Sequence, residues 1–140
     1  MAVIEAIATT YLEAEATSVE FTSIPGTYEH LQLRMNVKDQ RPLAIDPMDF
    51  TINGDTTAAN YSYHIFYAYD SVEGDYGVTS SVQISYITGQ GNSSGTASAT
   101  AYASMTMDIL DYANPNKNTV MTWTVNQFSE YRIYVMRGSQ

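Results

Sequence analysis

The sequence has no cysteine, which excludes disulfide bonds, thiolate metal sites and a cysteine nucleophile. Basic residues are also few, because six Lys and Arg stand against fifteen Asp and Glu and leave a formal net charge of -9. This charge repels a phosphate backbone, so nucleic acid is not expected as a partner. Without disulfide bonds or thiolate metal sites, the fold must be stabilised by packing alone.

Long apolar runs are absent too, since no stretch approaches the roughly twenty apolar residues that cross a bilayer. The first residues, MAVIEAIATTYLEAEA, have no basic residue before their apolar part and contain Glu5, Glu13 and Glu15. A signal peptide has the opposite pattern of charge. We therefore expect neither secretion nor a membrane partner.

What the sequence does contain is an apolar period of two. Its clearest segment alternates apolar residues with polar ones, which is the pattern of a strand with one wet face, and the apolar members are Leu31, Leu33, Met35 and Val37. Shorter segments with the same period surround Phe21, Ile84, Met107, Trp123 and Ile133. The 140 residues fit one domain, and we expect an all-β fold, an antiparallel β-sandwich or jelly roll of about eight or nine strands. Its predicted core contains Phe21, Leu31, Leu33, Met35, Ile84, Met105, Met107 and Trp123.

The first twelve residues or so form a separate feature. Their apolar side chains fit one helical face, but Thr9, Thr10 and Tyr11 favour extended backbone, so we expect a strand or an extended arm over residues 1–12. Apolar side chains are costly to leave in water. We therefore expect the arm to add to a sheet edge of a sister subunit or of another protein, through Ile4, Ile7, Tyr11 and Leu12.

A row of tyrosines lies in YSYHIFYAYD, residues 61–70. As a strand, this segment places its tyrosines on one face together with Ile65. Burial in a core or a subunit interface is the commoner fate of such a row. A stacking platform for sugar is the alternative, with Tyr67 and Tyr69 as its exposed members.

Catalytic motifs are weak. GNSSG, residues 91–95, matches the G-x-S-x-G nucleophile pattern around Ser93, but it lies in a Gly/Ser-rich loop without the strand and helix that such an elbow requires. His30 and His64 have no partner suggested by spacing, and Asp108 and Asp111 fall on opposite faces of a strand. We expect a protein that is not an enzyme.

Two loops are candidates for contacts. Asp70, Glu73 and Asp75 read as a solvated acidic turn, with a loop stiffened by calcium as the lesser alternative, and no other cofactor is expected. The segment 38–50, KDQRPLAIDPMDF, contains Pro42 and Pro47 and is expected to be an irregular excursion that contacts a partner.

Four stretches in order carry a family resemblance: IATTYL, SVEFTSIPGTYEHLQLRM, FTINGDTTAANYSYHIFY and MDILDYANPNKNTV. They resemble a family of small virion proteins of tailed bacteriophages, common among phages of cyanobacteria and other aquatic bacteria. The resemblance covers Ile7 to about Val120. Its most specific part is NGDTTAANYSYH, residues 53–64, followed by DILDYAN, residues 108–114.

The resemblance implies a β-sandwich structural protein without catalytic residues. The expected role is a capsid decoration or cement protein, made in the host cytoplasm and bound as a homo-oligomer to the major capsid protein on the outside of the virion, with a trimer preferred over a dimer. The alternative is a tail-fibre or receptor-binding module that recognises host glycan. Family members often continue past the equivalent of Gln140, so the sandwich either closes here with fewer strands or gains an edge from a neighbouring chain.

Overall fold

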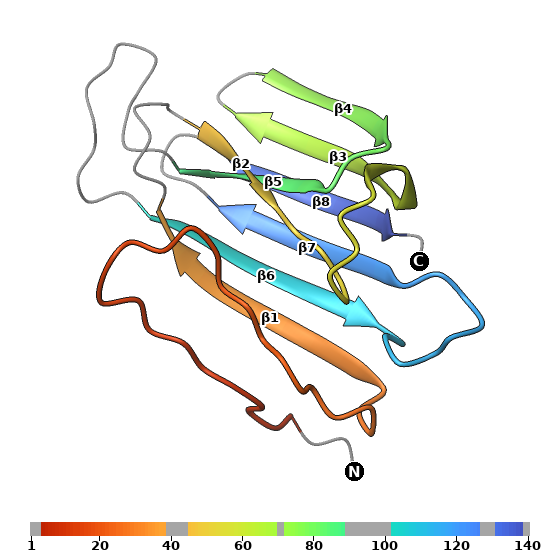
Figure 1. Ribbon diagram of the computed structural model, residues 1–140. Coiled ribbons are helices and arrows are strands. Elements are labelled where there is room, and N and C mark those ends of the chain that lie inside the picture. Colours follow the sequence, from red (N-terminus) through yellow and green to blue (C-terminus); the bar gives the residue numbers. More distant parts are fainter. Residues whose placement is uncertain (1–3, 39–44, 70–71, 89–101, 127–130, 139–140) are drawn as a thin grey trace.

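The structure is a computed structural model that describes residues 4–38, 45–69, 72–88, 102–126 and 131–138. Its strands are β1 (His30–Val37), β2 (Ile45–Asp49), β3 (Tyr61–Tyr69), β4 (Val72–Thr79), β5 (Gln83–Thr88), β6 (Ala103–Leu110), β7 (Val120–Asn126) and β8 (Tyr131–Gly138) (Figure 1). A 3-10 turn, η1 (Ala58–Asn60), is the one helical element of these ranges, and none of the described chain forms a helix long and apolar enough to cross a membrane. All strand pairs are antiparallel, which confirms the predicted all-β class.

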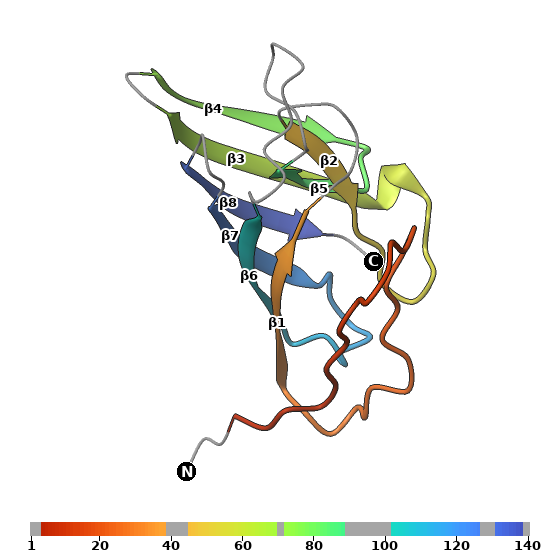
Figure 2. The same cartoon turned by 90° about the vertical axis from the view of Figure 1, so that its left-hand side faces the viewer.

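The strands form two sheets. One has six strands in the order β1-β6-β7-β8-β3-β4, and the other contains β2 and β5. The two-stranded sheet lies against one face of the larger sheet, near its middle (Figures 1 and 2). Phe50 extends the small sheet by donating its backbone N–H to the carbonyl of Val82 at 2.9 Å. Strands β1 and β4 are left at the two edges of the larger sheet.

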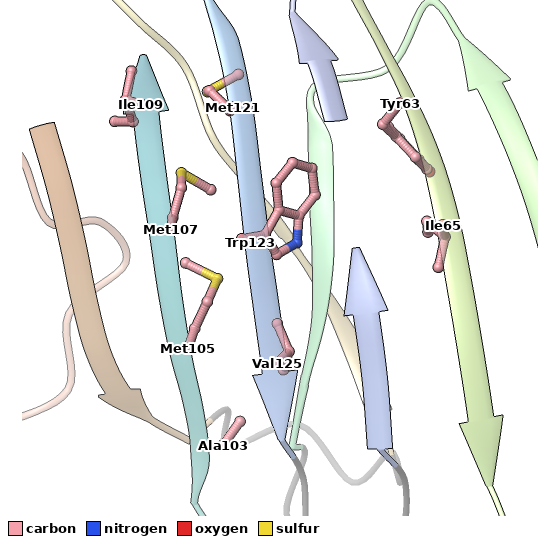
Figure 3. Close-up of a cluster of buried hydrophobic side chains, with 9 residues drawn as sticks. All are labelled: Tyr63, Ile65, Ala103, Met105, Met107, Ile109, Met121, Trp123 and Val125. Carbon is pink, nitrogen blue, oxygen red and sulfur yellow. The ribbon is translucent and has the colours of Figure 1, made fainter. Parts of the chain in front are cut away.

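The core lies on the face that the small sheet covers. Alternate residues of β6 and β7 point to this face, and the register sets Met107 opposite Trp123 and Met105 opposite Val125. Trp123 lies at the centre of the buried cluster (Figure 3), and the cluster comprises Tyr63, Ile65, Ala103, Met105, Met107, Ile109, Met121, Trp123 and Val125. The predicted burial of Met105, Met107 and Trp123 is confirmed.

Cover over this face is uneven. Met48, Phe50 and Ile52 pack against the cluster from the segment that contains β2. The apolar residues of β1 also contact the cluster but are only half-buried, and they are Leu31, Leu33, Met35 and Val37. The core face thus remains partly open at the β1 edge.

Two predicted elements differ from the structure. The segment around Val19 and Phe21 is not a strand, and Phe21 is 36% exposed instead of buried, because the described chain offers it no neighbouring strand to pair with. Residues 38–50 are not wholly irregular, because β2 occupies Ile45–Asp49. Among the described strands β2 pairs only with β5, so one edge of β2 has no paired strand. Proline has no backbone N–H to donate and is tolerated on such an edge strand. The predicted core residue Ile84 lies in β5, where the side chains are outside the described part.

Candidate interaction surface

The N-terminal arm, residues 4–27, has no regular secondary structure and every one of its residues is exposed. It extends well past the predicted boundary near residue 12. Ile4 and Tyr11 are nearly fully solvent-accessible, at 89% and 87%. Its other exposed large apolar side chains are Ile7, Leu12, Val19, Phe21 and Ile24. The arm therefore presents large apolar side chains to solvent, most fully at Ile4 and Tyr11.

Two tyrosines tie the arm to the domain. The Tyr28 hydroxyl donates to Glu5 Oε2 at 3.0 Å, and this hydrogen bond raises the pKa of Tyr28 because the protonated phenol is the donor. The Tyr112 hydroxyl donates to the carbonyl of Pro25. Before it enters β1, the arm doubles back on the side of the large sheet that carries β2 and β5, without joining the sheet (Figures 1 and 2).

The edge strand β1 has two unlike faces. Its half-buried residues join the core face, whereas its other face is polar and exposed. On that polar face Gln32 Nε2 donates to Asp108 Oδ1 at 2.8 Å, and Arg34 Nε donates to Gln32 Oε1 at 2.8 Å. Arg34 is thus exposed on the polar face of β1, and β1 itself contains no acidic residue.

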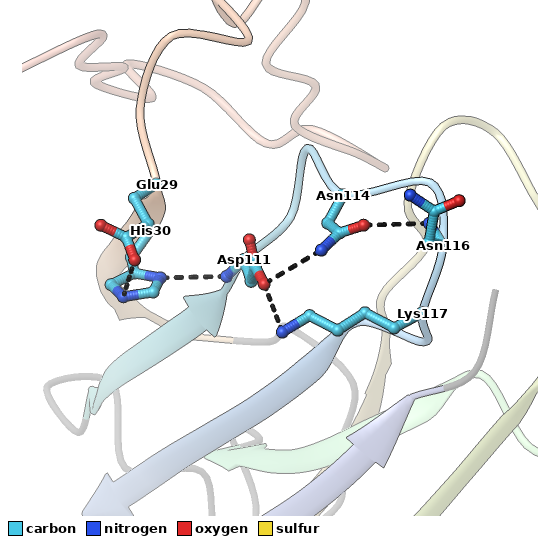
Figure 4. A network of polar contacts seen from close by, with 6 residues as sticks. All are labelled: Glu29, His30, Asp111, Asn114, Asn116 and Lys117. Atoms are coloured by element: carbon cyan, nitrogen blue, oxygen red, sulfur yellow. Dashed lines mark hydrogen bonds and ion pairs between the residues drawn. The ribbon is translucent and has the colours of Figure 1, made fainter.

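The turn after β6 is organised by Asp111 (Figure 4). Lys117 forms an ion pair with its carboxylate, Asn114 Nδ2 donates to the same oxygen at 3.4 Å, and the Asp111 N–H donates to His30 Nδ1 at 3.0 Å. The Lys117 hydrogen bond is the main cause that lowers the pKa of Asp111. These contacts join the end of β6 to the beginning of β1 and hold the anchor of the arm in place.

The tyrosine row lies mainly inside. Tyr61, Tyr63 and Ile65 are buried, and Tyr67 is half-buried with its ring against Tyr76 at 6.2 Å between centroids. Tyr69 ends β3, and its side chain is outside the described part of the structure. The arrangement favours the core interpretation of this row over an exposed platform.

The loop before β3 is closed by the first tyrosine of the row. The Tyr61 hydroxyl donates to the carbonyl of Asp55 at 2.8 Å and accepts the N–H of Ile52 at 3.1 Å. The Asp55 carboxylate accepts from Asn60 Nδ2 at 2.6 Å and from the Thr57 N–H at 2.8 Å, and the Asn60 bond is the main cause that lowers its pKa. The residues NGDTTAANY thus form a self-contained structural loop.

A polar pair occupies the opposite face of β3 and β4. His64 Nε2 lies 2.9 Å from Asp75 Oδ2, and the His64 ring lies 4.9 Å from that of Phe66, which is half-exposed. The sequence suggested no partner for His64 because the contact crosses between strands. The feature of the sequence that could have suggested this pair is the short separation between the two strand segments. Two segments this close in sequence are typical of an antiparallel hairpin, whose register decides which side chains meet.

The remaining predicted site residues are scattered. Glu73 and Asp75 lie on β4 and not in an acidic turn, while Asp70, Pro42 and Ser93 fall outside the described residues. Pro47 is in β2 opposite Tyr86 in the register. Within the described ranges no group of three or more His, Asp and Glu side chains could hold a metal ion.

Comparisons with family models, with curated proteins and with solved structures each found no match.

Proposed function

We propose that this protein is a bacteriophage capsid decoration protein that binds the outside of the major capsid shell and stabilises it. The observation that carries the proposal is the N-terminal arm, whose apolar side chains are exposed along its whole described length. Large exposed apolar side chains gathered on one segment are typical of a protein interaction site. The sequence resemblance to small virion proteins of tailed bacteriophages is what supports a phage particle as the partner.

A decoration protein stabilises a capsid by mass action, because it binds the assembled shell and not the separated components. The net charge of -9 favours the exterior, because an interior subunit would face packaged DNA of the same sign. We propose the major capsid protein as the partner, with synthesis in the host cytoplasm before assembly.

The finer fold belongs to the same proposal. We propose a β-sandwich in which the sheet of β2 and β5 is the second layer, and Met48 and Phe50 support this because they pack on the cluster of the six-stranded sheet. The two-stranded sheet covers only part of the core face of the six-stranded sheet. We propose that a segment from another chain covers the remaining part of that face, next to β1.

One observation favours a second candidate, a tail-fibre module that binds host glycan. Phe66 exposes half of its surface beside the His64 and Asp75 pair, and an aromatic face next to hydrogen-bonding groups suits a sugar ring. This site would use the outer face of β3, and not Tyr67 and Tyr69. Phe66→Ala should abolish glycan binding under this alternative and leave shell binding intact under the first.

The direct test is binding to capsids that lack the protein. Full-length protein should bind expanded shells in saturable amounts, and a variant lacking residues 1–27 should not, while its circular dichroism remains that of a β protein. A variant with Phe66→Ala is the matched control, because it removes an exposed apolar group of the domain itself. Equal binding by the arm deletion would reject the arm as the contact, and no binding by any form would reject the decoration role.

A further inference from the structure

Within the arm, residues 18–22 have the sequence SVEFT, which alternates Val19 and Phe21 with polar neighbours. β-Branched and aromatic residues with this period favour a strand. The structure gives the segment no regular secondary structure and no paired strand within the described ranges, with Val19 47% exposed. A strand forms only when a neighbouring strand supplies hydrogen-bond partners. The sequence of this segment suits a strand, but the segment pairs with no sheet edge in the described part of the chain.

The six-stranded sheet offers two edges, β1 and β4. Among the described strands β1 pairs only with β6, and β4 only with β3. An exposed edge is a template for a further strand from another chain. Both edges are therefore geometrically available to the segment.

Charge distinguishes the two edges. The arm contains Glu5, Glu13, Glu15 and Glu20 and no Lys or Arg. Strand β1 contains Arg34 and no acidic residue, and Lys38 follows it directly, whereas β4 contains Glu73 and Asp75 and no basic residue. Electrostatic complementarity selects the correct partner surface and suppresses the wrong one. The acidic arm therefore matches the β1 edge.

The alternation matches as well. If Val19 and Phe21 face the core side, they extend the open row of β1 that consists of Leu31, Leu33, Met35 and Val37. Glu20 then points to the opposite face, on which Arg34 lies. One register thus satisfies an apolar face and a charged face together.

From these observations we propose that residues 18–22 of one copy pair, as an added strand, with the β1 edge of a second copy, with Glu20 close to the partner's Arg34. The anchor of Pro25 at Tyr112 keeps the segment near its own domain, so the second copy lies directly against this edge. Ser23 has a positive φ of 57°, so the backbone leaves the extended region directly after the segment and before β1. Because each copy carries both a donor segment and an acceptor edge, two copies related by a two-fold axis would exchange both segments at once. This inference concerns self-association and does not depend on the capsid role.

Reversal of the paired charges tests the proposal. Sedimentation of the full-length protein should detect an oligomer whose dissociation constant rises at least about fivefold with Glu20→Arg alone or with Arg34→Glu alone. The double variant E20R/R34E should recover most of the affinity. Glu73→Arg on the β4 edge is the matched control and should leave association unchanged. Circular dichroism of each variant checks that the domain is folded.

Mixing separates exchange between copies from pairing within one chain. Equal amounts of the E20R and R34E proteins should associate with each other, because each variant arm then meets an edge of opposite charge. Failure of the mixture or of the double variant to associate would overturn the proposal. A wild-type protein that stays monomeric at high micromolar concentration, single variants that associate normally, or loss of association with Glu73→Arg would overturn it too.

Discussion

The hydroxyl of Tyr67 lies across the backbone of Gly74 on the neighbouring strand, so closely that a Cβ at Gly74 would stand 2.6 Å from that oxygen and 2.8 Å from the ring carbon that carries it. The register sets these two residues opposite each other in the β3–β4 pair. Glycine at this position therefore leaves room for the Tyr67 ring to lie close to β4 while it packs against the core cluster.

Gly74→Ala should force the Tyr67 ring off the core and destabilise the fold by about 1–3 kcal/mol, the usual cost of overpacking. Urea unfolding followed by tryptophan fluorescence measures this change. Gly26→Ala is the matched control, because nothing lies within 4 Å of a Cβ there. Equal stability of the G74A and wild-type proteins would contradict the packing of Tyr67 described above.

Met107→Ala should lower the free energy of unfolding by about 2–5 kcal/mol, since Met107 is fully buried and its loss leaves a cavity beside Trp123, its partner across the strands. Leu110→Ala on the same strand is the control, because Leu110 is 37% exposed. Its cost should be well below that of the M107A variant in the same denaturant titration. A reversed order would place the core on the other face of β6.

Tyr61→Phe should cost about 1–3 kcal/mol, because it removes both hydrogen bonds of the hydroxyl and leaves the part-buried N–H of Ile52 without its acceptor. Amide hydrogen exchange should show lost protection at Ile52 in particular. Tyr11→Phe, on the exposed arm, should change neither stability nor exchange in the domain. Retained protection of Ile52 in the Y61F protein would show that Tyr61 does not close the loop.

The free energy of unfolding should depend on pH through the ionisation of Asp111. Its pKa is lowered in the folded state, chiefly by Lys117, so its contribution is present above the unfolded value of about 4 and is lost as the pH falls through the folded pKa. Asp111→Asn should therefore be less stable than wild type at pH 7, and the difference should shrink below about pH 4. Asparagine also tolerates the left-handed backbone at this position, where φ is 53°. A difference in unfolding free energy that is independent of pH would contradict the ion pair.

The sequence predicted much of the large sheet because its faces have contrasting environments. In β6 and β7 the core face is buried and the other is wetter, so the residues around Met107 and Trp123 carry a clean period of two. The same period around Phe21 was misleading, because a β-forming pattern does not tell whether an edge is available within the chain. Cross-strand contacts such as His64 with Asp75 depend on register, which local patterns fix only through the turn.

The candidate surface was only half visible in the sequence. Exposed apolar residues at the beginning of the chain indicated an arm that needs a partner, and the structure extends that arm to residue 27. Its contrast with the basic β1 edge required the strand order, since β1 and β4 become the two edges only in the folded sheet.

Electron cryomicroscopy of purified virions would show whether this protein lies on the outside of the shell. For a decoration protein we expect density for the domain at repeated positions on the outer capsid surface, in a constant ratio to the major capsid protein, with the N-terminal arm at the contacts. Copies found only at the tail tip, only inside the shell or nowhere on the particle would rule out the decoration role.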